Sequence, residues 1–248
     1  MLRAADISVH YGGVYAVKKV SFELREGEVL GIVGPNGSGK STLLNAIGGL
    51  TRSSGSLDID GAAIPLNRPA RPRRAGFLRT FQTPQVFTEL SCIENVMLSA
   101  SDRRGIGLLG SFLSRPFMWR SERARIDNAK AALDRVGLGH LANRSAEGLA
   151  YGQNRHLEIA RAIAAKPKYL AMDEPSAGLN QVETSTLANL IKSFAADGVT
   201  ILVVDHKIDF LRGICSRMLV LQLGEVIADG SPDEVFANPA VVDAYLGV

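Results

Sequence analysis

The sequence has few of the features that mark an extracellular or membrane-spanning protein. Its 248 residues include only two cysteines, Cys92 and Cys215, and no CxxC motif, so neither a disulfide framework nor a zinc site is indicated. No apolar run approaches the roughly 20 residues that span a bilayer, and the first residues lack the apolar segment of a secretory signal. We therefore expect a soluble, cytoplasmic protein.

An excess of one charge is also missing. The 28 basic and 25 acidic residues leave a net charge of only +3, which does not indicate a nucleic-acid partner. The local exception is the segment NRPARPRRAGFLR, whose arginines are Arg68, Arg71, Arg73, Arg74 and Arg79. Apart from Phe77 this segment lacks the aromatic residues that stack on bases. We interpret it as a solvated helix or loop face.

The hydrophobic pattern predicts an α/β fold. Three uniformly apolar runs, EVLGIVG, YLAMD and TILVVD, are typical of strands buried on both faces of a parallel sheet. Five shorter runs predict antiparallel strands at its flank, namely ADISVHY, VKKVSFEL, GSLDIDG, RMLVLQLG and EVIADG. With 46% apolar residues, the chain is long enough for one domain that carries an extra lobe.

That lobe is predicted to be helical. Between about residues 92 and 165 the strand pattern stops, and SERARIDNAKAALDRVG places Ala129, Leu133 and Val136 on one side of a helix. We expect a helical subdomain at about 92–165 inserted into a single domain of residues 1–248. Its apolar segment 105–119 is expected to cover the insert's own core, and a docking surface for another protein is the alternative.

The stretch GPNGSGKS follows the first uniformly apolar run and leads into the helix-like TLLNAIGG. It satisfies the pattern G-x-x-x-x-G-K-[ST]. A loop with few β-carbons can wrap its backbone N–H groups around an anion, and the helix that begins there directs its positive dipole end to the same place. We predict a phosphate-binding loop formed by Gly34, Pro35, Asn36, Gly37, Ser38, Gly39, Lys40, Ser41 and Thr42.

Within this loop we expect Lys40 to reach the β- and γ-phosphates and the Ser41 hydroxyl to ligate Mg²⁺. Thr42 is expected to donate to an α-phosphate oxygen. The motif alone leaves kinases, GTPases and transport ATPases open.

Polar residues at the ends of two other apolar strands complete the predicted site. Asp173 would lie at the carboxyl edge of the sheet, where it can hold the water shell of the metal. Glu174 is suited to polarise the attacking water as a general base, and His206 is placed to touch a γ-phosphate. Each of these residues is by itself more often structural. Together with the phosphate loop they predict hydrolysis of a nucleoside triphosphate.

Taken together, these motifs resemble the nucleotide-binding subunit of ATP-binding-cassette (ABC) transporters, from Tyr11 to the C-terminus. The discriminating element is LAYGQNRHLEIARAI, which is similar to the LSGGQ signature that opens a helix in that family and that ordinary kinases and GTPases lack. The resemblance implies that the γ-phosphate bound by the other subunit faces Ala150, Tyr151, Gly152 and Gln153. Ala150 replaces the serine of the signature, so one hydrogen bond is missing there, and we still expect ATP as the ligand.

The resemblance implies three further roles. Tyr11 is similar to the aromatic residue that stacks on adenine. Gln82 in RTFQTPQVF resembles the glutamine that links Mg²⁺ and the attacking water to the transmembrane partner, so that Ser41, Gln82 and Asp173 form the implied metal site. SAGLN, residues 176–180, resembles the loop that meets the opposite subunit, although Asn180 stands where aspartate is commoner.

RTFQ, LAYGQ, EPSAGLN and AYLG are similar to one ATPase subunit of branched-chain or hydrophobic amino-acid importers. The implied fold is a P-loop NTPase (RecA-like) core with an antiparallel β subdomain and an inserted helical subdomain. The implied mechanism is that two subunits sandwich two ATP molecules, so that ATP and Mg²⁺ drive closure of the pair.

The implied partners are a second ATPase subunit, in a heterodimer or, in isolation, a homodimer, and two transmembrane permease subunits. A periplasmic or extracellular solute-binding protein is an indirect partner, and no nucleic acid is expected. Such an ATPase lies on the inner face of the cell membrane. The alternatives are a soluble ATPase of the same superfamily in DNA repair or translation, a P-loop kinase, and a regulatory module that holds ATP without hydrolysing it.

Overall fold

The computed structural model describes residues 1–99 and 115–246, so the expected roles of segment 105–119 lie largely outside the described residues. The chain forms two compact units. The first contains Met1–Gln82 and Pro167–Val248, and the second contains Thr83–Lys166. The predicted insert at 92–165 lies within the bounds of the second unit.

A six-stranded mixed sheet is the centre of the first unit, with the strand order β10-β9-β3-β8-β7-β6. Three of its strands are buried at every residue and pair in parallel, as their uniformly apolar sequences predicted. These strands are β3 (Val29–Val33), β7 (Tyr169–Asp173) and β8 (Thr200–Val204). The predicted α/β fold is therefore confirmed.

Two strands of this sheet differ from the prediction. RMLVLQLG was assigned to the antiparallel flank, but β9 (Arg217–Gln222) pairs in parallel with β3 and antiparallel only with β10 (Glu225–Gly230). Four central residues of β9 are buried because both faces of the strand are covered. The edge strand β6 (Phe77–Arg79) was not predicted, because three residues are too few to show a period.

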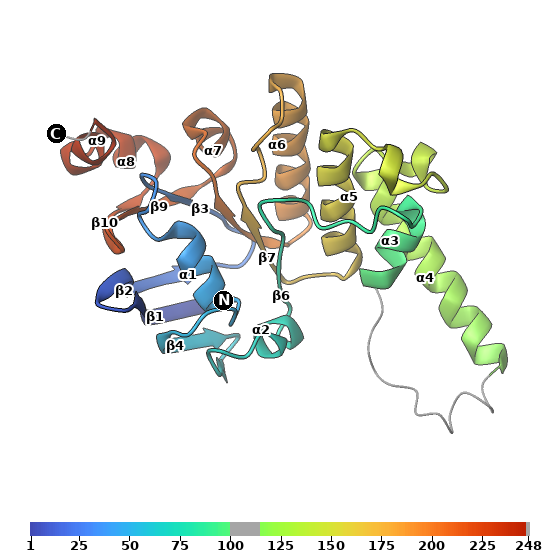
Figure 1. Cartoon of the computed structure of the whole chain (residues 1–248), viewed down its shortest axis with the longest axis horizontal. Helices are drawn as coiled ribbons and strands as arrows, with labels where there is room; N and C mark the ends of the chain where they lie inside the picture. Colours follow the sequence, from blue (N-terminus) through green and yellow to red (C-terminus); the bar gives the residue numbers. More distant parts are fainter. Residues whose placement is uncertain (100–114, 247–248) are drawn as a thin grey trace. The chain divides into compact units, whose positions relative to one another are not determined.

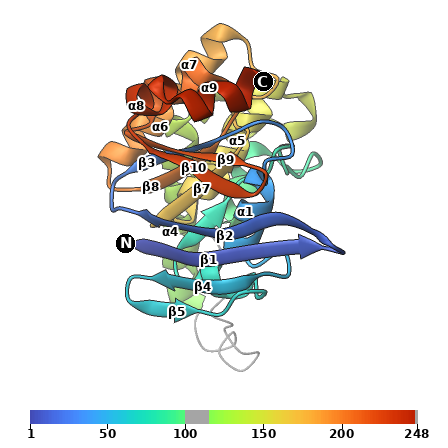
Figure 2. The same cartoon turned by 90° about the vertical axis from the view of Figure 1, so that its left-hand side faces the viewer.

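An antiparallel sheet with the order β2-β1-β4-β5 forms a second layer of the first unit. Its strands are β1 (Leu2–Tyr11), β2 (Val14–Leu24), β4 (Ser54–Ile59) and β5 (Ala62–Ile64). Helix α1 (Lys40–Ile47) lies between the two sheets, and its buried Leu43, Leu44 and Ile47 join residues of both sheets in one hydrophobic core (Figures 1 and 2).

The remaining helices of this unit complete its surface. They are the short α2 (Ala70–Arg74) before β6, and α6 (Gln181–Ala196), α7 (Ile208–Ile214), α8 (Pro232–Ala237) and α9 (Pro239–Leu246). The last four lie on the face of the mixed sheet opposite α1 (Figure 2). Of these helices, α6 follows β7 in the chain and α7 follows β8.

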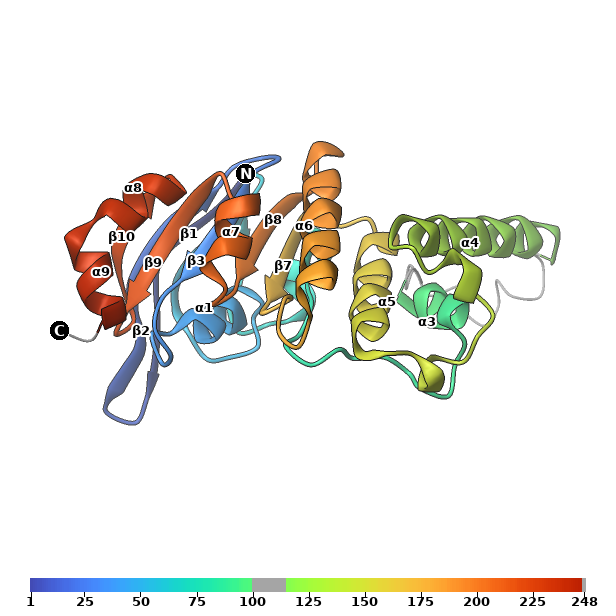
Figure 3. The same cartoon turned by 90° about the horizontal axis from the view of Figure 1, so that it is seen from above.

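Helices make up the second unit. Its long helices are α3 (Cys92–Ser99), α4 (Arg115–Arg135) and α5 (Tyr151–Ala164), and its short 3₁₀ turns are η1 (Gly139–Leu141) and η2 (Ala146–Gly148). The three long helices pack against one another (Figure 3). Ala129, Leu133 and Val136 are buried, as the helical spacing predicted.

Asp60 joins the two sheets of the first unit. It follows β4, and its Oδ1 accepts hydrogen bonds from the Met1 amino group (2.7 Å), the Tyr169 hydroxyl (2.7 Å) and Lys168 Nζ (3.0 Å). The hydrogen bond from the amino group, and then the one from Tyr169, hold the pKa of Asp60 well below its usual range. Tyr169 begins β7, so this carboxylate ties the antiparallel sheet to the mixed sheet.

We predict that Asp60→Asn lowers the melting temperature by a few degrees at pH 7, which corresponds to about 1 kcal/mol for a partly exposed carboxylate. Because the folded-state pKa of Asp60 is lowered, its contribution exists above the unfolded pKa of about 4 and is lost as the pH falls toward the folded pKa. Thermal unfolding of both proteins from pH 7 down to pH 2.5 measures this. The difference in melting temperature between the wild type and Asp60→Asn should shrink below about pH 4. Asp243→Asn, which changes an exposed carboxylate, is the control and should melt at the wild-type temperature at every pH. A difference in melting temperature that does not change with pH would contradict a stabilising role of the Asp60 carboxylate.

Candidate active site

The loop 34–39 connects β3 to α1 and is held closely on both sides. A β-carbon on Gly34 would lie 2.1 Å from the Leu221 carbonyl oxygen, and one on Gly39 would lie 2.2 Å from the Ala16 carbonyl oxygen. Both glycines also have positive φ, 148° and 101°. The backbones of β9 and β2 therefore exclude side chains at these two positions.

Main-chain hydrogen bonds fix the same loop to the turn between β9 and β10. The Gly224 N–H donates to the Ser38 carbonyl (3.1 Å), and the Lys18 N–H of β2 donates to the Gly224 carbonyl (2.8 Å). The Ser38 hydroxyl is buried and has no hydrogen-bond partner among the described residues. A buried hydroxyl without a partner is rare and fits a loop built around a polar ligand.

Lys40, the first residue of α1, reaches back across this loop. Its Nζ donates to the carbonyl oxygens of Gly34 (2.8 Å) and Pro35 (2.9 Å). Burial lowers the pKa of Lys40, while the charges of Glu174 and Asp173 raise it. Two carbonyls of the loop thus hold the ammonium group of Lys40 over the loop, near the carboxylates of Glu174 and Asp173.

Glu174 lies in the same hollow as this loop. The hollow has a volume of about 190 Å³ and is lined by Ala16, Asn36, Gly37, Gly39, Lys40, Ser41, Thr42 and Glu174. Glu174 has a left-handed backbone (φ 45°), and its N–H donates to the Val204 carbonyl (2.7 Å), which extends the pairing of β7 with β8 by one residue. A left-handed conformation costs a non-glycine residue about 1 kcal/mol, and such residues cluster at functional sites.

Asp173 is held from two sides. Its Oδ1 accepts a hydrogen bond from the Ser41 hydroxyl (3.2 Å), and its Oδ2 accepts one from Arg79 Nη2 (2.7 Å). Arg79 Nη1 also donates to Asn45 Oδ1 on α1 (2.5 Å). The ion pair is buried, since the Arg79 and Asp173 side chains are 9% and 6% exposed.

The interpretation of Arg79 as part of a solvated face is therefore wrong. Arg79 lies opposite Ala171 in the parallel pairing of β6 with β7, two residues before Asp173, so its side chain reaches the carboxyl edge of the sheet. The other four arginines of that segment are exposed, as expected. The apolar pair Phe77–Leu78 directly before Arg79 is the signal of a short strand that would have separated Arg79 from the rest.

Gln82 approaches the site from the end of the segment after β6. Its Nε2 donates to Glu174 Oε2 (2.8 Å). The structure therefore brings together Lys40, Ser41, Asp173, Glu174 and Gln82, which come from three distant parts of the sequence.

His206 and Tyr11 are among the predicted site residues that do not line this hollow. His206 follows β8 but borders a separate hollow of about 620 Å³ between α6 and α7, where its side chain is 56% exposed. Tyr11 ends β1 with an exposed ring, and its Oη is hydrogen-bonded to Thr51 Oγ1 (3.0 Å).

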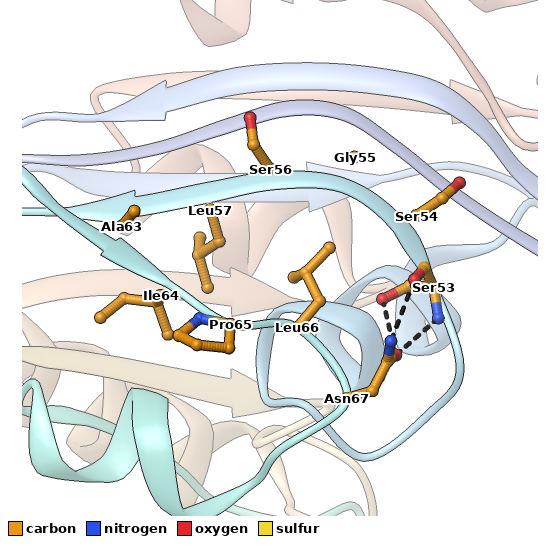
Figure 4. A pocket seen from close by; sticks show the side chains of 10 residues that line it. All are labelled: Ser53, Ser54, Gly55, Ser56, Leu57, Ala63, Ile64, Pro65, Leu66 and Asn67. Carbon is orange, nitrogen blue, oxygen red and sulfur yellow. Dashed lines mark hydrogen bonds between the residues drawn. The ribbon is translucent and has the colours of Figure 1, made fainter.

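A further hollow of about 430 Å³ lies on the antiparallel sheet (Figure 4) and is lined by residues 53–57 and 63–67. Asn67 Oδ1 there accepts hydrogen bonds from the Ser53 N–H (2.7 Å) and hydroxyl (3.3 Å). No lining residue has an ionisable side chain. The phosphate-loop hollow combines Lys40 and Glu174 with a glycine loop that holds a buried hydroxyl, unpartnered in the described part of the chain, and it is the candidate active site.

The segment LAYGQ begins α5 in the helical unit. Ala150 is the N-cap residue, and Gln153 Oε1 accepts a hydrogen bond from the Ala150 N–H (2.9 Å). Ala150 has no side-chain oxygen, so the reciprocal bond to the Gln153 N–H is missing and only half of a capping box is present. Ala150 and Tyr151 are exposed and Gly152 is buried.

Comparison with known proteins identifies the family. Residues 17–177, well over half of the chain, match the family model described as ABC transporter. The chain belongs to the ABC transporter family. Residues 225–248 of this ABC ATPase match a second model, described as branched-chain amino acid ATP-binding cassette transporter. The expected ATP-binding P-loop NTPase is therefore confirmed, and the ABC ATPase is an enzyme that hydrolyses ATP.

Curated relatives and solved structures agree with this assignment. The ABC ATPase is 37% identical over 249 residues to the high-affinity branched-chain amino acid transport ATP-binding protein LivG of Salmonella typhimurium, covering 100% of this chain and 98% of LivG. It resembles the crystal structure of a nucleotide-free ATP-binding cassette from an ABC transporter with a TM-score of 0.85, 32% identity, and coverage of 100% and 99% of the two chains. It also resembles an ATP-binding cassette seen as a dimer with ADP and Pi, with a TM-score of 0.77, 29% identity, and coverage of 94% and 99%.

None of the helices that the structure describes in this ABC ATPase is long and apolar enough to cross a membrane.

We predict that Arg79→Met destabilises the ABC ATPase by about 3 kcal/mol, because the Asp173 carboxylate would stay buried without its ionic partner. Unfolding in urea, followed by circular dichroism, measures the change. Arg74→Met is the matched control, since Arg74 lies in the same segment but is exposed, and it should alter stability by less than about 0.5 kcal/mol. Equal losses of unfolding free energy in the two variants would contradict a stabilising buried ion pair between Arg79 and Asp173.

We predict that Ala150→Ser stabilises α5 by about 1 kcal/mol, because the new hydroxyl can accept the Gln153 N–H and complete the capping box. Thermal unfolding should show a melting temperature raised by a few degrees. Ala165→Ser, at the opposite end of the same helix, supplies the same hydroxyl where no free N–H needs it and should leave the melting temperature unchanged. A lower melting temperature for Ala150→Ser would contradict the N-cap assignment.

Proposed function

We propose that this chain is the ATP-binding and hydrolysing subunit of an importer for branched-chain or other hydrophobic amino acids. Its full-length similarity to LivG and the match of residues 225–248 support this substrate class over a soluble ATPase of DNA repair or translation. We also propose that residues 1–248 act as one ATPase domain, with the helical unit as an inserted subdomain.

The position of Glu174 in the hollow of the phosphate loop supports its proposed catalytic role. Backbone N–H groups of the loop and the start of α1 would bind the phosphates. Lys40 would exchange its two carbonyl partners for oxygens of the β- and γ-phosphates. Glu174 would then accept a proton from the water that attacks the γ-phosphate.

Gln82 and Arg79 would position the two carboxylates. The hydrogen bond from Gln82 Nε2 orients Glu174, and the ion pair with Arg79 directs the other oxygen of Asp173 toward Ser41. Both carboxylates are then held in place before nucleotide binds, which lowers the cost of ordering the site.

Oxygen donors at the site fit Mg²⁺, which prefers carboxylate, hydroxyl and phosphate oxygens. Ser41, Asp173 and Gln82 would hold the ion together with the nucleotide, since the described residues contain no group of three or more acidic, His or Cys side chains that could hold a metal ion alone. When bound, Mg²⁺ would neutralise charge on the β- and γ-phosphates.

Further contacts would come from outside the hollow. We propose that His206 touches the γ-phosphate and that Tyr11 stacks on adenine. Ala150, Tyr151, Gly152 and Gln153 would face the nucleotide of a second ATPase subunit, and the exposed start of α5 is consistent with such a contact.

The proposed assembly is a pair of ATPase subunits on two transmembrane permease subunits, supplied by a periplasmic or extracellular solute-binding protein. The similarity to a dimeric cassette supports the pairing of subunits. We propose a heterodimer in the complete importer, at the inner face of the cell membrane.

We predict that Glu174→Gln binds ATP with unchanged affinity but hydrolyses it at least 100-fold more slowly, because the amide cannot accept the proton. Lys40→Met should lose ATP binding itself. A fluorescent ATP analogue measures affinity, and phosphate release measures turnover. Glu89→Gln, which changes an exposed carboxylate of the helical unit, is the control and should retain full activity. Wild-type turnover in Glu174→Gln would overturn the assignment of the base.

The same variants test transport. In proteoliposomes that contain the co-purified permease subunits and the binding protein, ATP-dependent uptake of radiolabelled leucine should be lost with Glu174→Gln and kept with Glu89→Gln. Turnover without uptake of any hydrophobic amino acid would contradict the importer proposal and leave the ATPase assignment intact.

A further inference from the structure

The segment that carries His206 is joined to the loop Ser176–Asn180 by a buried carboxylate. Asp205 Oδ2 accepts a hydrogen bond from the Ser176 N–H (3.0 Å), and Asp205 Oδ1 accepts bonds from the N–H groups of His206 (2.8 Å) and Lys207 (3.0 Å). Asp205 is fully buried. A buried carboxylate needs such partners, so it holds the two segments at a fixed distance.

Lys207, on the other side of His206, makes a second connection to this loop. Its Nζ donates to the carbonyl oxygens of Ser176 (3.0 Å) and Leu179 (3.1 Å) and lies 3.4 Å from Thr184 Oγ1. An ammonium group has three N–H donors, and these three contacts occupy them. Lys207 is therefore placed to bind the loop and has no donor left for a phosphate.

The two carbonyls belong to one tight turn. The Leu179 N–H donates to the Ser176 carbonyl (3.2 Å), so both ends of the turn direct carbonyl oxygens at the same ammonium group. Ser176 and Leu179 are buried. Loss of the ammonium would leave the Leu179 carbonyl without this partner and would loosen the turn.

We propose that Lys207 is a positioning residue that makes the loop Ser176–Asn180 and the His206 segment move as one unit. The proposal rests on the proposed function, in which His206 touches the γ-phosphate and the loop meets the opposite subunit. A contact between His206 and the γ-phosphate would then order the loop Ser176–Asn180, which contacts the second subunit. Binding of one ATP would thus be coupled through Lys207 to the ATP site that the second subunit shares.

Hydrogen–deuterium exchange tests the positioning directly. In the nucleotide-free chain, Lys207→Met should raise the exchange of the amides of residues 176–180 at least tenfold and leave those of β3 unchanged. Lys207→Arg, which keeps two or more donors, should restore most of the protection. Lys192→Met is the matched control, because Lys192 is an exposed lysine of α6 that borders the same hollow, and it should behave as wild type.

Nucleotide binding tests the communication. In the Glu174→Gln background, ATP and Mg²⁺ should protect residues 176–180 when Lys207 is present, and this protection should be lost in Lys207→Met although ATP affinity stays within threefold. Retained protection, or exchange raised equally in all segments of the first unit, would overturn the proposal. If the chain with Lys207 fails to bind ATP, the proposed function fails, and the nucleotide-free comparison still decides whether Lys207 positions the loop.

Discussion

The close approach of three backbones at the loop 34–39 is the constraint on which the rest of the structure depends. The carbonyls of Ala16 and Leu221 leave no room for a side chain at Gly39 or Gly34, so the loop is held between β2 and β9 before any ligand binds. This arrangement exposes N–H groups at the start of α1, where the helix dipole already favours an anion. The two sheets that clamp the loop are in turn held together by the core around α1.

Around that loop, each charged group is restrained by a hydrogen-bond partner. Arg79 holds Asp173 and Gln82 holds Glu174, while Lys40 rests on two carbonyls of the loop itself. Glu174 also adopts a left-handed backbone whose cost is offset by its hydrogen bond to Val204. Glu174, which we propose as the general base, is thus placed by strand pairing and not by a flexible loop, as a reaction that depends on positioning and electrostatics would require.

Much of this arrangement could be predicted from the sequence because its causes are local. Uniformly apolar runs identified β3, β7 and β8, and the parallel sheet then brought the polar ends of these strands to one edge. Features with distant causes were missed. The parallel partner of β9 depends on which strand lies beside it, and the burial of Arg79 depends on the pairing of the three-residue β6 with β7. The carbonyls that exclude a side chain at Gly34 and Gly39 belong to residues 221 and 16. The glycines could therefore be recognised in the sequence, but the contacts that require them could not. The separate hollow at His206 likewise comes from the packing of α6 and α7.

We propose that the main-chain amides of the phosphate loop and Glu174 enclose the triphosphate of ATP. A crystal structure of the Glu174→Gln chain grown with ATP and Mg²⁺ tests it most directly. We expect phosphate oxygens within hydrogen-bond distance of the N–H groups of residues 37–42 and the side chain of residue 174 beside the γ-phosphate. A triphosphate bound elsewhere, for example between α6 and α7, or a γ-phosphate remote from residue 174, would contradict it.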